Sequence, residues 1–376
     1  MLQRYVLPLA AAALLVAATP PAGKTLDIYV VDTEGGKAAL FVSPSGESLL
    51  IDAGSPGGRD TDRIMAAVTE AGLKQIDYLL LTHYHVDHVG GVLPLAEKIP
   101  IKHFVDHGPT VEEKEQVPGF QQAYAALYAK ATHTIVKPGD KVPIAGLDWL
   151  IVTAGGKVLK TPLPGAGSPN PACAETKPRE NPRDPENGQS TGSLITFGKF
   201  RALDLGDLLW NNELDLMCPN NPIGTIDLYM VSHHGLDQSG SPALVHALQP
   251  RVAIMQNGQR KGAAVLTMQT LHTTPRLQDV WQLHWGFGAG LEHNSPSAFI
   301  ANVEDPAMVA ALLTANPMMP NPTPTPAAGA SAAPPPTASG ARPAGHTGPA
   351  NEIKVSVRDD GTFTVTNTRN GFSRSY

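Results

Sequence analysis

Short apolar runs alternate with segments of helical periodicity along most of the chain. Three β-rich runs lie within residues 25–54, and the breaks TEGG and PSGE between them predict a meander of strands. Apolar side chains recur at helical spacing over residues 61–73, and the run IDYLLL at 76–81 predicts a further strand. Strands and helices that alternate through short loops indicate a layered α/β fold.

A second series of strands and helices follows a loop rich in proline and glycine at residues 161–188. A loop of this length is typical of a functional or poorly ordered segment. In the first series, residues 111–130 are predicted to form a helix. The second series predicts a hairpin around Lys199, a helix to Met217, a strand at 226–235, a helix at 241–248 and a strand at 251–258.

The beginning of the chain has the pattern of a signal peptide at residues 1–23. Arg4 precedes an apolar run from Tyr5 to Ala18, and small residues with a proline pair follow. About 14 apolar residues are too few for a membrane-spanning helix of roughly 20. We therefore expect a periplasmic or secreted protein with no membrane span after signal removal. A buried or anchoring N-terminal helix is the alternative.

A proline-rich segment marks the end of the main domain, which we place at residues 24–316. Ten of the 33 residues from Pro317 to Pro349 are proline, so this segment should be a disordered insertion or linker. Residues 350–376 hold two alternating runs joined through DDG, the pattern of a β-hairpin. Because an isolated hairpin is marginally stable in water, we expect it to pack on the main domain.

The composition is that of a globular protein and gives no sign of a nucleic-acid-binding surface. Of the 376 residues 42% are hydrophobic and 16% are charged, which suffices for one large core or two modest ones. The formal net charge is −6, and −7 without Arg4, whereas polyanion-binding proteins usually carry a basic excess. Cys173 and Cys218 would either form a disulfide or remain buried thiols, and their spacing does not decide between these alternatives.

The stretch THYHVDHVGG at residues 82–91 combines histidines with an aspartate directly after an apolar strand. Strand alternation places His83, His85 and Asp87 on one side, and a turn after Asp87 would bring His88 to the same region. The stretch can therefore present two imidazoles to a first divalent ion, and a carboxylate and an imidazole to a second. Nitrogen and oxygen ligands without a thiolate suit Zn²⁺, Mn²⁺ or Fe²⁺.

These residues resemble the HxHxDH motif of the metallo-β-lactamase fold superfamily, which HYHVDH matches. LLIDAG at residues 49–54 is similar to the first motif of that fold, with Asp52 as a support for the metal loop. The resemblance implies a four-layer αβ/βα sandwich with mixed sheets. It also implies one or two divalent metal ions, with Zn²⁺ favoured over Mn²⁺ and Fe²⁺, and it makes residues 24–316 a hydrolase domain.

The resemblance further implies a carboxylate that bridges the two ions and a histidine from a late strand. LDLGD ends a strand at Asp207, which we expect to be the bridging ligand, and VSHHG ends another at His233 and His234. Because adjacent strand residues point to opposite faces, only one of these histidines should be a ligand. His234 is favoured, and His233 would then line the pocket or donate a proton.

Over residues 25–260 the chain is similar to one branch, the hydrolase domain of ComEC-like DNA-internalisation competence proteins. Where most of the superfamily has a third-motif histidine, this chain reads GQSTGS with Gln189 and Ser190. His107 is one possible substitute ligand, and an exposed loop histidine is the alternative. The chain also has Lys37 where the branch carries an acid, and it lacks the many membrane spans of the competence proteins.

The function expected from these features is hydrolysis by a metal-bound hydroxide, with Asp87 accepting the proton of the attacking water. A phosphodiester is the favoured substrate because the resemblance is to specific stretches of the competence proteins. A small ester, lactone or β-lactam is the alternative that export and the acidic charge favour. A non-catalytic, metal-supported binding module is a third possibility, and nothing in the sequence specifies an oligomeric state.

Overall fold

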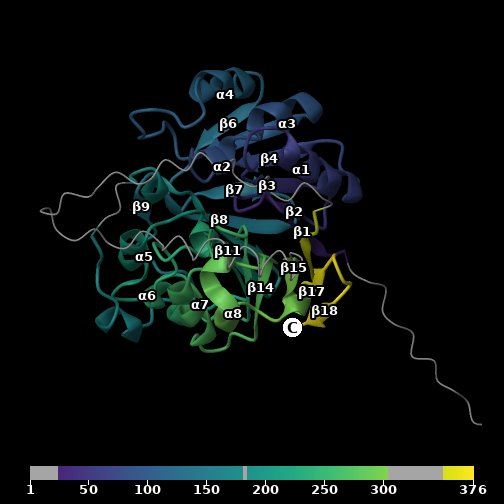
Figure 1. Ribbon diagram of the computed structural model, residues 1–376. Helices are drawn as coiled ribbons and strands as arrows, with labels where there is room; N and C mark the ends of the chain where they lie inside the picture. The colour runs from purple at the N-terminus through teal and green to yellow at the C-terminus, as the bar shows by residue number, and fades with distance from the viewer. Residues whose placement is uncertain (1–23, 181–183, 304–349) are drawn as a thin grey trace, which may run out of the picture.

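Two mixed nine-stranded sheets pack face to face, and helices cover the outer side of each sheet (Figure 1). The computed structural model describes residues 24–180, 184–303 and 350–376. The predictions for residues 1–23 and 317–349 lie outside the described residues. The layer order confirms the four-layer αβ/βα sandwich that the sequence predicts.

The first sheet has the order β18-β17-β16-β1-β2-β3-β4-β5-β6. Neighbouring strands are antiparallel from β18 to β3 and parallel from β3 to β6. Its strands are β1 (Leu26–Val30), β2 (Ala39–Val42), β3 (Ser48–Ile51), β4 (Ile76–Leu80), β5 (Ile101–Asp106), β6 (Thr132–Ile135), β16 (Ile353–Val357), β17 (Phe363–Asn367) and β18 (Ser373–Ser375).

The second sheet has the order β15-β14-β13-β12-β11-β10-β8-β7, with β9 paired to β8. Strands β11 to β15 are parallel, and the other pairs are antiparallel. Its strands are β7 (Lys141–Ile144), β8 (Leu147–Ala154), β9 (Lys157–Val158), β10 (Gly192–Phe197), β11 (Phe200–Asp204), β12 (Leu228–Met230), β13 (Val252–Met255), β14 (Asp279–His284) and β15 (Ile300–Asn302).

The helices divide between the two outer layers. The helices before β7 are α1 (Arg59–Glu70), α2 (Val86–Val89), α3 (Val92–Lys98) and α4 (Phe120–Tyr128), and those after β11 are α5 (Trp210–Met217), α6 (Pro242–Leu248), α7 (Val265–His272) and α8 (Gly290–His293). Short 3₁₀ turns are η1 (Pro171–Ala174), η2 (Asn187–Gln189), η3 (Ser232–Gly235), η4 (Phe287–Ala289) and η5 (Ser297–Phe299).

The helix predicted over residues 111–130 is shorter than expected. It begins only at Phe120, after Pro118 and a Gly119 with a φ of 75°. A left-handed residue directly after a proline interrupts helical geometry, so the preceding residues form a loop.

Side-chain alternation along the strands divides the apolar residues among three cores. Ile28, Phe41 and Ile51 point between the sheets and pack with residues such as Trp149 and Ile254 of the second sheet. The intervening Leu40 and Leu50 point outwards to α1, α3 and α4. A corresponding core lies between the second sheet and helices α5, α6 and α7. Each fully buried aliphatic side chain contributes roughly 1.5–3 kcal/mol, so the sheet interface is a major stabilising element.

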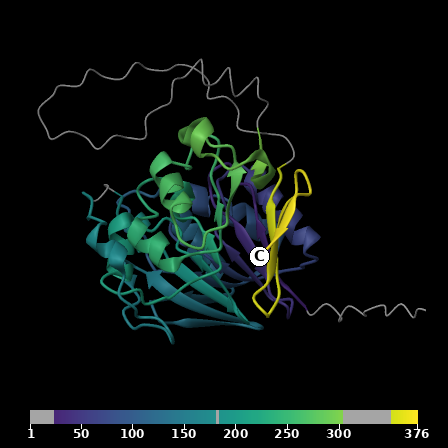
Figure 2. The ribbon, with the colours of Figure 1, turned by 90° about the horizontal axis from the view of Figure 1, so that it is seen from below.

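The hairpin at the end of the chain pairs with the strand at its beginning. Strand β16 lies antiparallel to β1, with Val355 opposite Ile28, and β17 and β18 continue the sheet outwards. Figure 2 shows this hairpin in yellow beside the purple N-terminal strands. Because β16 pairs with β1, the edge of the sheet on this side is the short strand β18.

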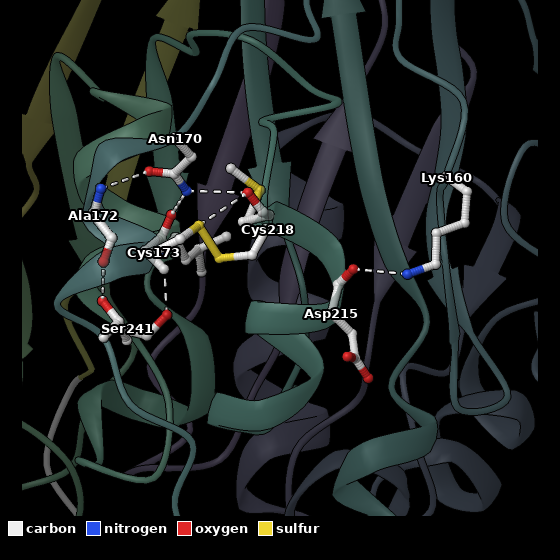
Figure 3. Close-up of a disulfide and its surroundings, with 11 residues drawn as sticks. Lys160, Asn170, Ala172, Cys173, Asp215, Cys218 and Ser241 are labelled. Atoms are coloured by element: carbon white, nitrogen blue, oxygen red, sulfur yellow. Dashed lines mark hydrogen bonds between the residues drawn. A yellow bond between two sulfur atoms is a disulfide. The ribbon is translucent and has the colours of Figure 1, made fainter.

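A disulfide joins Cys173 in η1 to Cys218 at the end of α5 (Figure 3). Beside it, the Asn170 side chain donates hydrogen bonds to the carbonyls of Met217 and Ala243 at 3.1 and 2.8 Å. Of the two alternatives left open by the sequence, the structure has the disulfide. The long loop before β10 is thereby held against α5 and α6.

None of the helices in the described part of the chain is long and apolar enough to span a membrane.

Replacing both cysteines, as in Cys173→Ser with Cys218→Ser, should lower the free energy of unfolding. The bridge spans 45 residues of sequence, and the loop entropy that it removes from the unfolded chain corresponds to about 4 kcal/mol. Urea unfolding measures the loss. Dithiothreitol should destabilise the wild type by a similar amount and leave the double variant unchanged, whereas equal stability of the two proteins would contradict this expectation.

Candidate metal centre

The predicted ligands lie on loops that follow strands of both sheets. Strand β4 of the first sheet ends at Leu80, and the HxHxDH stretch follows it. In the second sheet, β11 ends at Asp204 and β12 at Met230, and their loops carry Asp207 and the pair His233 and His234. The short distances between these side chains show that the three loops meet at one place.

Asp52 at the end of β3 fixes the orientation of His88. Its Oδ1 accepts a hydrogen bond from the backbone N–H of Thr82 at 2.8 Å, and its Oδ2 accepts one from the Thr82 hydroxyl at 2.7 Å. The same Oδ2 lies 2.8 Å from Nδ1 of His88. A carboxylate accepts, so Nδ1 carries the proton and Nε2 of His88 points into the site. Asp52 adopts a φ of 60°, a strained conformation for a residue other than glycine.

One carboxylate oxygen, Oδ2 of Asp207, lies at the centre of the histidines. It is 3.3 Å from Nε2 of both His88 and His234, 3.5 Å from Nε2 of His233 and 4.0 Å from Nε2 of His83. The backbone N–H of Asp207 donates to Oγ of Ser190 at 3.1 Å, which places Ser190 as a support for this loop.

Gly206 lets the loop of Asp207 approach the first sheet closely. A Cβ atom at this position would lie 2.7 Å from Cβ of Thr82, and the φ of 58° also favours glycine.

Both His233 and His234 point towards Asp207, although strand alternation predicts opposite directions. The two residues lie in the turn η3 and adopt φ values of 53° and 56°, so alternation does not apply to them. Nδ1 of His234 donates to the carbonyl of Gln256 at 3.1 Å, and Nδ1 of His233 lies 3.2 Å from Oγ of Ser239, which itself donates to the Leu208 carbonyl. In both rings Nδ1 is held by the surrounding chain, and Nε2 faces the site.

Asp87 lies on the second side of the centre. Its Oδ2 is 3.2 Å from Nε2 of His234 and 3.5 Å from Nε2 of His88. The ammonium of Lys261, in the loop after β13, forms an ion pair with the same oxygen, and the Lys261 side chain is 37% exposed. The sequence analysis missed Lys261, because nothing in its local pattern relates it to Asp87.

Burial and charge set the protonation of these groups. Burial alone would raise the pKa of the Asp207 carboxyl, but the charges of His234 and His88 outweigh it and hold the pKa well below its usual value. Burial lowers the pKa of His233 to about 4 and that of His83 well below its usual value. For His88, burial is outweighed by Asp207, Asp52 and Asp87, which raise its pKa to about 10. These shifts favour ionised carboxylates at Asp87 and Asp207, neutral rings at His83 and His233 and a protonated ring at His88.

The donor set fits divalent metal ions. Two groups of ligand atoms lie close enough together to share an ion: His83, His88 and Asp207, and Asp87, His88 and His234. Among the described residues, Nε2 of His83 and Oδ1 of Asp207 are buried without a hydrogen-bond partner. An unpaired buried polar atom costs about 1–3 kcal/mol, and a bound cation would remove that cost.

A sequence model described as "Metallo-beta-lactamase superfamily" matches residues 32–172, which include the HxHxDH stretch. The chain belongs to the metallo-beta-lactamase superfamily.

Three curated relatives are similar to parts of the chain. Ribonuclease Z of Methanopyrus kandleri is 34% identical over 178 residues, 45% of this chain and 60% of the relative. Hydroxyacylglutathione hydrolase of Klebsiella pneumoniae subsp. pneumoniae is 31% identical over 115 residues, 31% of this chain and 37% of the relative. ComE operon protein 3 of Bacillus subtilis is 26% identical over 194 residues, 51% of this chain and 21% of the relative. The chain therefore spans less than two thirds of each of these relatives.

Two residues considered as superfamily ligands lie apart from the Asp207 group. Nε2 of His85 is 3.1 Å from Oε1 of Glu112 and 3.3 Å from Oδ1 of Asp184, two acids that sequence analysis did not single out. His107, considered as a substitute ligand, has its Nε2 3.0 Å from Oε1 of the buried Glu186. Asp184 and Glu112 had no recognisable motif, so only the folded chain relates them to His85.

The turn that opens the superfamily match is held by buried ion pairs. Asp32 lies 2.7 Å from Nε2 of His284 and 3.0 Å from a guanidinium nitrogen of Arg63. Lys37, which stands where the competence branch carries an acid, is buried. Its Nζ lies 2.7 Å from Oδ1 of Asp204. Since Asp204 ends β11, Lys37 connects this turn to the strand that leads to Asp207.

Substituting Asp52→Asn should weaken metal binding by about 10- to 100-fold, because His88 loses the charged acceptor that orients it. Competition with a chromophoric chelator measures the affinity. Asp77→Asn is the matched control, since Asp77 also accepts a backbone hydrogen bond across β3 and β4, from Ser48 at 2.9 Å, away from the metal centre. Unchanged affinity in Asp52→Asn would show that Asp52 does not support the site.

Proposed function

We propose that this protein is a metal-dependent hydrolase that holds one or two divalent ions, with Zn²⁺ favoured over Mn²⁺ and Fe²⁺. The observation that carries the proposal is the convergence of imidazole nitrogens on a single buried carboxylate. Oδ2 of Asp207 lies within 3.5 Å of Nε2 of His88, His233 and His234. Oδ1 of Asp207 and Nε2 of His83 are buried without a hydrogen-bond partner among the described residues, which supports metal binding over a purely structural network.

The ions, when bound, supply Lewis acidity that lowers the pKa of water and stabilises developing negative charge on a carbonyl or phosphoryl group. His83, His85, Asp87, His88, Asp207 and His234 are the proposed ligands. Asp87, held by Lys261 on its outer side, is the proposed acceptor of the proton from water. His233 presents a neutral ring to the site, which fits a proton acceptor or ligand better than a proton donor.

A phosphodiester is the proposed substrate. One of the similar proteins is named ribonuclease Z, and a ribonuclease acts on phosphodiesters. The resemblance to the competence branch supports the same class. Lys261 brings a partly exposed ammonium beside Asp87, where it can contact a non-bridging oxygen of an anionic substrate.

A small ester or thioester is the second candidate. A similar protein is named hydroxyacylglutathione hydrolase, and the formal net charge of −6 gives the chain no general attraction for polyanions. Lactones and β-lactams belong to the same class of carbonyl substrates.

Export is proposed for the cellular location. The signal-peptide pattern at residues 1–23 supports it, and a disulfide such as Cys173–Cys218 persists in oxidising compartments.

The metal-loaded protein should cleave bis(p-nitrophenyl) phosphate faster than nitrocefin, a lactone or a hydroxyacyl thioester, and should lose activity after chelation. Lys261→Gln should lower kcat/KM for the phosphodiester by about 10- to 100-fold, the effect of one lost contact to a charged group. Initial rates and metal content are measured together, so that loss of an ion is separated from loss of substrate binding.

Lys141→Gln is the control for Lys261→Gln, because Lys141 also pairs with an aspartate, Asp148 at 2.8 Å, but lies on β7. Cleavage of the carbonyl substrates alone would move the assignment to the second candidate. A protein with no bound metal as purified, and no gain of thermal stability on adding Zn²⁺ or Mn²⁺, would instead favour the binding module.

A further inference from the structure

The third-motif position of the superfamily carries Gln189 in this chain, and its side chain lies away from the metal centre. Its Nε2 is 3.3 Å from the carbonyl of Pro185, and it packs near Gly156 in the β8–β9 turn. Gln189 therefore does not replace the missing imidazole. The first ion, beside His83 and His85, needs a ligand from another residue.

His85 faces a carboxylate from the loop that precedes Gln189. Its Nε2 is 3.3 Å from Oδ1 of Asp184, and the ligand atoms of His85, Asp184 and Glu112 are close enough together to share one cation. The ring of His85 lies edge-on to that of His83, with centroids 4.5 Å apart. His83 is fully buried and its Nε2 has no hydrogen-bond partner in the described chain. An unused donor thus lies directly beside the group around His85.

Asp184 is oriented by a buried amide. Nδ2 of Asn187 donates to Oδ2 of Asp184 at 3.1 Å, and the Asn187 backbone N–H donates at 3.3 Å to Oδ1, the oxygen that faces His85. The same Nδ2 is 3.5 Å from Nε2 of His233. A hydrogen bond to the outer oxygen of a carboxylate is the usual support of a metal ligand.

We infer that the Asp184 carboxylate is a protein ligand of the first ion in place of the third-motif imidazole, beside His83, His85 and the bridging Asp207. The inference rests on the metal site of the proposed function but on no particular substrate. Asp184 is chosen over Glu112 because the Asn187 amide holds it in place. Glu112 reaches His85 through a side chain with one more rotatable bond, whose ordering costs more entropy.

A carboxylate in place of the third imidazole changes the preference of the site for metals. Carboxylate oxygen suits Mn²⁺ and Fe²⁺ better than a third imidazole does. The first ion of this chain should therefore be less selective for Zn²⁺ than that of a three-histidine site.

An ordinary ion pair between a protonated His85 and its two acidic neighbours would have the same contacts. The two interpretations differ in metal stoichiometry and not in the contacts themselves. Replacing a ligand removes an ion or changes the metal preference of the site, whereas replacing an ion-pair partner that only orients His85 lowers the affinity for Zn²⁺ and Mn²⁺ alike.

The test compares the wild type with Asp184→Asn, Glu112→Gln and Asp184→His. Elemental analysis after gel filtration gives bound equivalents, and chelator competition gives separate affinities for Zn²⁺ and Mn²⁺. Asp184→Asn should lose one ion or bind it at least about tenfold more weakly. Glu112→Gln should stay within about threefold of the wild type. Asp184→His should keep the ion and shift the Zn²⁺ over Mn²⁺ preference at least about tenfold towards Zn²⁺.

Wild-type affinity and stoichiometry in Asp184→Asn would overturn the inference, as would loss of the ion in Glu112→Gln but not in Asp184→Asn. Urea unfolding of each variant shows whether it is folded. A misfolded Asp184→His protein would not retain the ion with a shifted metal preference, so that result separates loss of a ligand from loss of the fold. A wild type that binds no Zn²⁺ or Mn²⁺ would refute the proposed function itself. That result differs from a wild type that binds metal ions whose number and affinity stay the same when Asp184 is replaced.

Discussion

The packing of the two sheets through their shared apolar core is the constraint on which the metal centre depends. His88 follows β4 of the first sheet, and Asp207 and His234 follow β11 and β12 of the second, so no single sheet supplies the whole centre. Polar contacts cross between the sheets near the same edge. The Thr191 N–H donates to the Thr82 carbonyl at 2.8 Å, and the Gln256 side chain donates to the Ala38 carbonyl at 3.0 Å.

The centre concentrates ionised groups in the protein interior, where an uncompensated charge destabilises the fold. Asp52 and Asp207 are buried carboxylates, which are tolerated only when cations or hydrogen-bond donors surround them. His88 lies between the two, and their charges outweigh its burial and raise its pKa to about 10. Left-handed conformations at Asp52, His233 and His234 each cost on the order of 1–3 kcal/mol, and the surrounding fold holds them. The apolar core therefore stabilises a site that would not form by itself.

Glu186 organises the outer side of the centre. Its carboxylate accepts hydrogen bonds from the Tyr84 and Val111 N–H groups at 3.1 and 2.9 Å, and lies 3.0 Å from Nε2 of His107. Burial alone would raise the pKa of Glu186, but the hydrogen bond and charge of His107 outweigh burial and lower it. One carboxylate thus connects the HxHxDH stretch, the loop after β5 and the loop that carries Asp184. His107 helps to hold the Glu186 carboxylate in place, although it is in none of the groups of possible metal ligands.

The sequence by itself determined the alternation of strands and helices, the superfamily motif and the chemical nature of the site. These features are local: apolar periodicity reflects which face of an element is buried, and the motif from His83 to His88 is continuous in the sequence. Only the tertiary structure decided that Asp184 faces His85 and that Lys261 faces Asp87, because loops far apart in the chain meet only after the sheets pack. It also decided that His233 and His234 point the same way, since their left-handed backbone cancels the alternation of a strand.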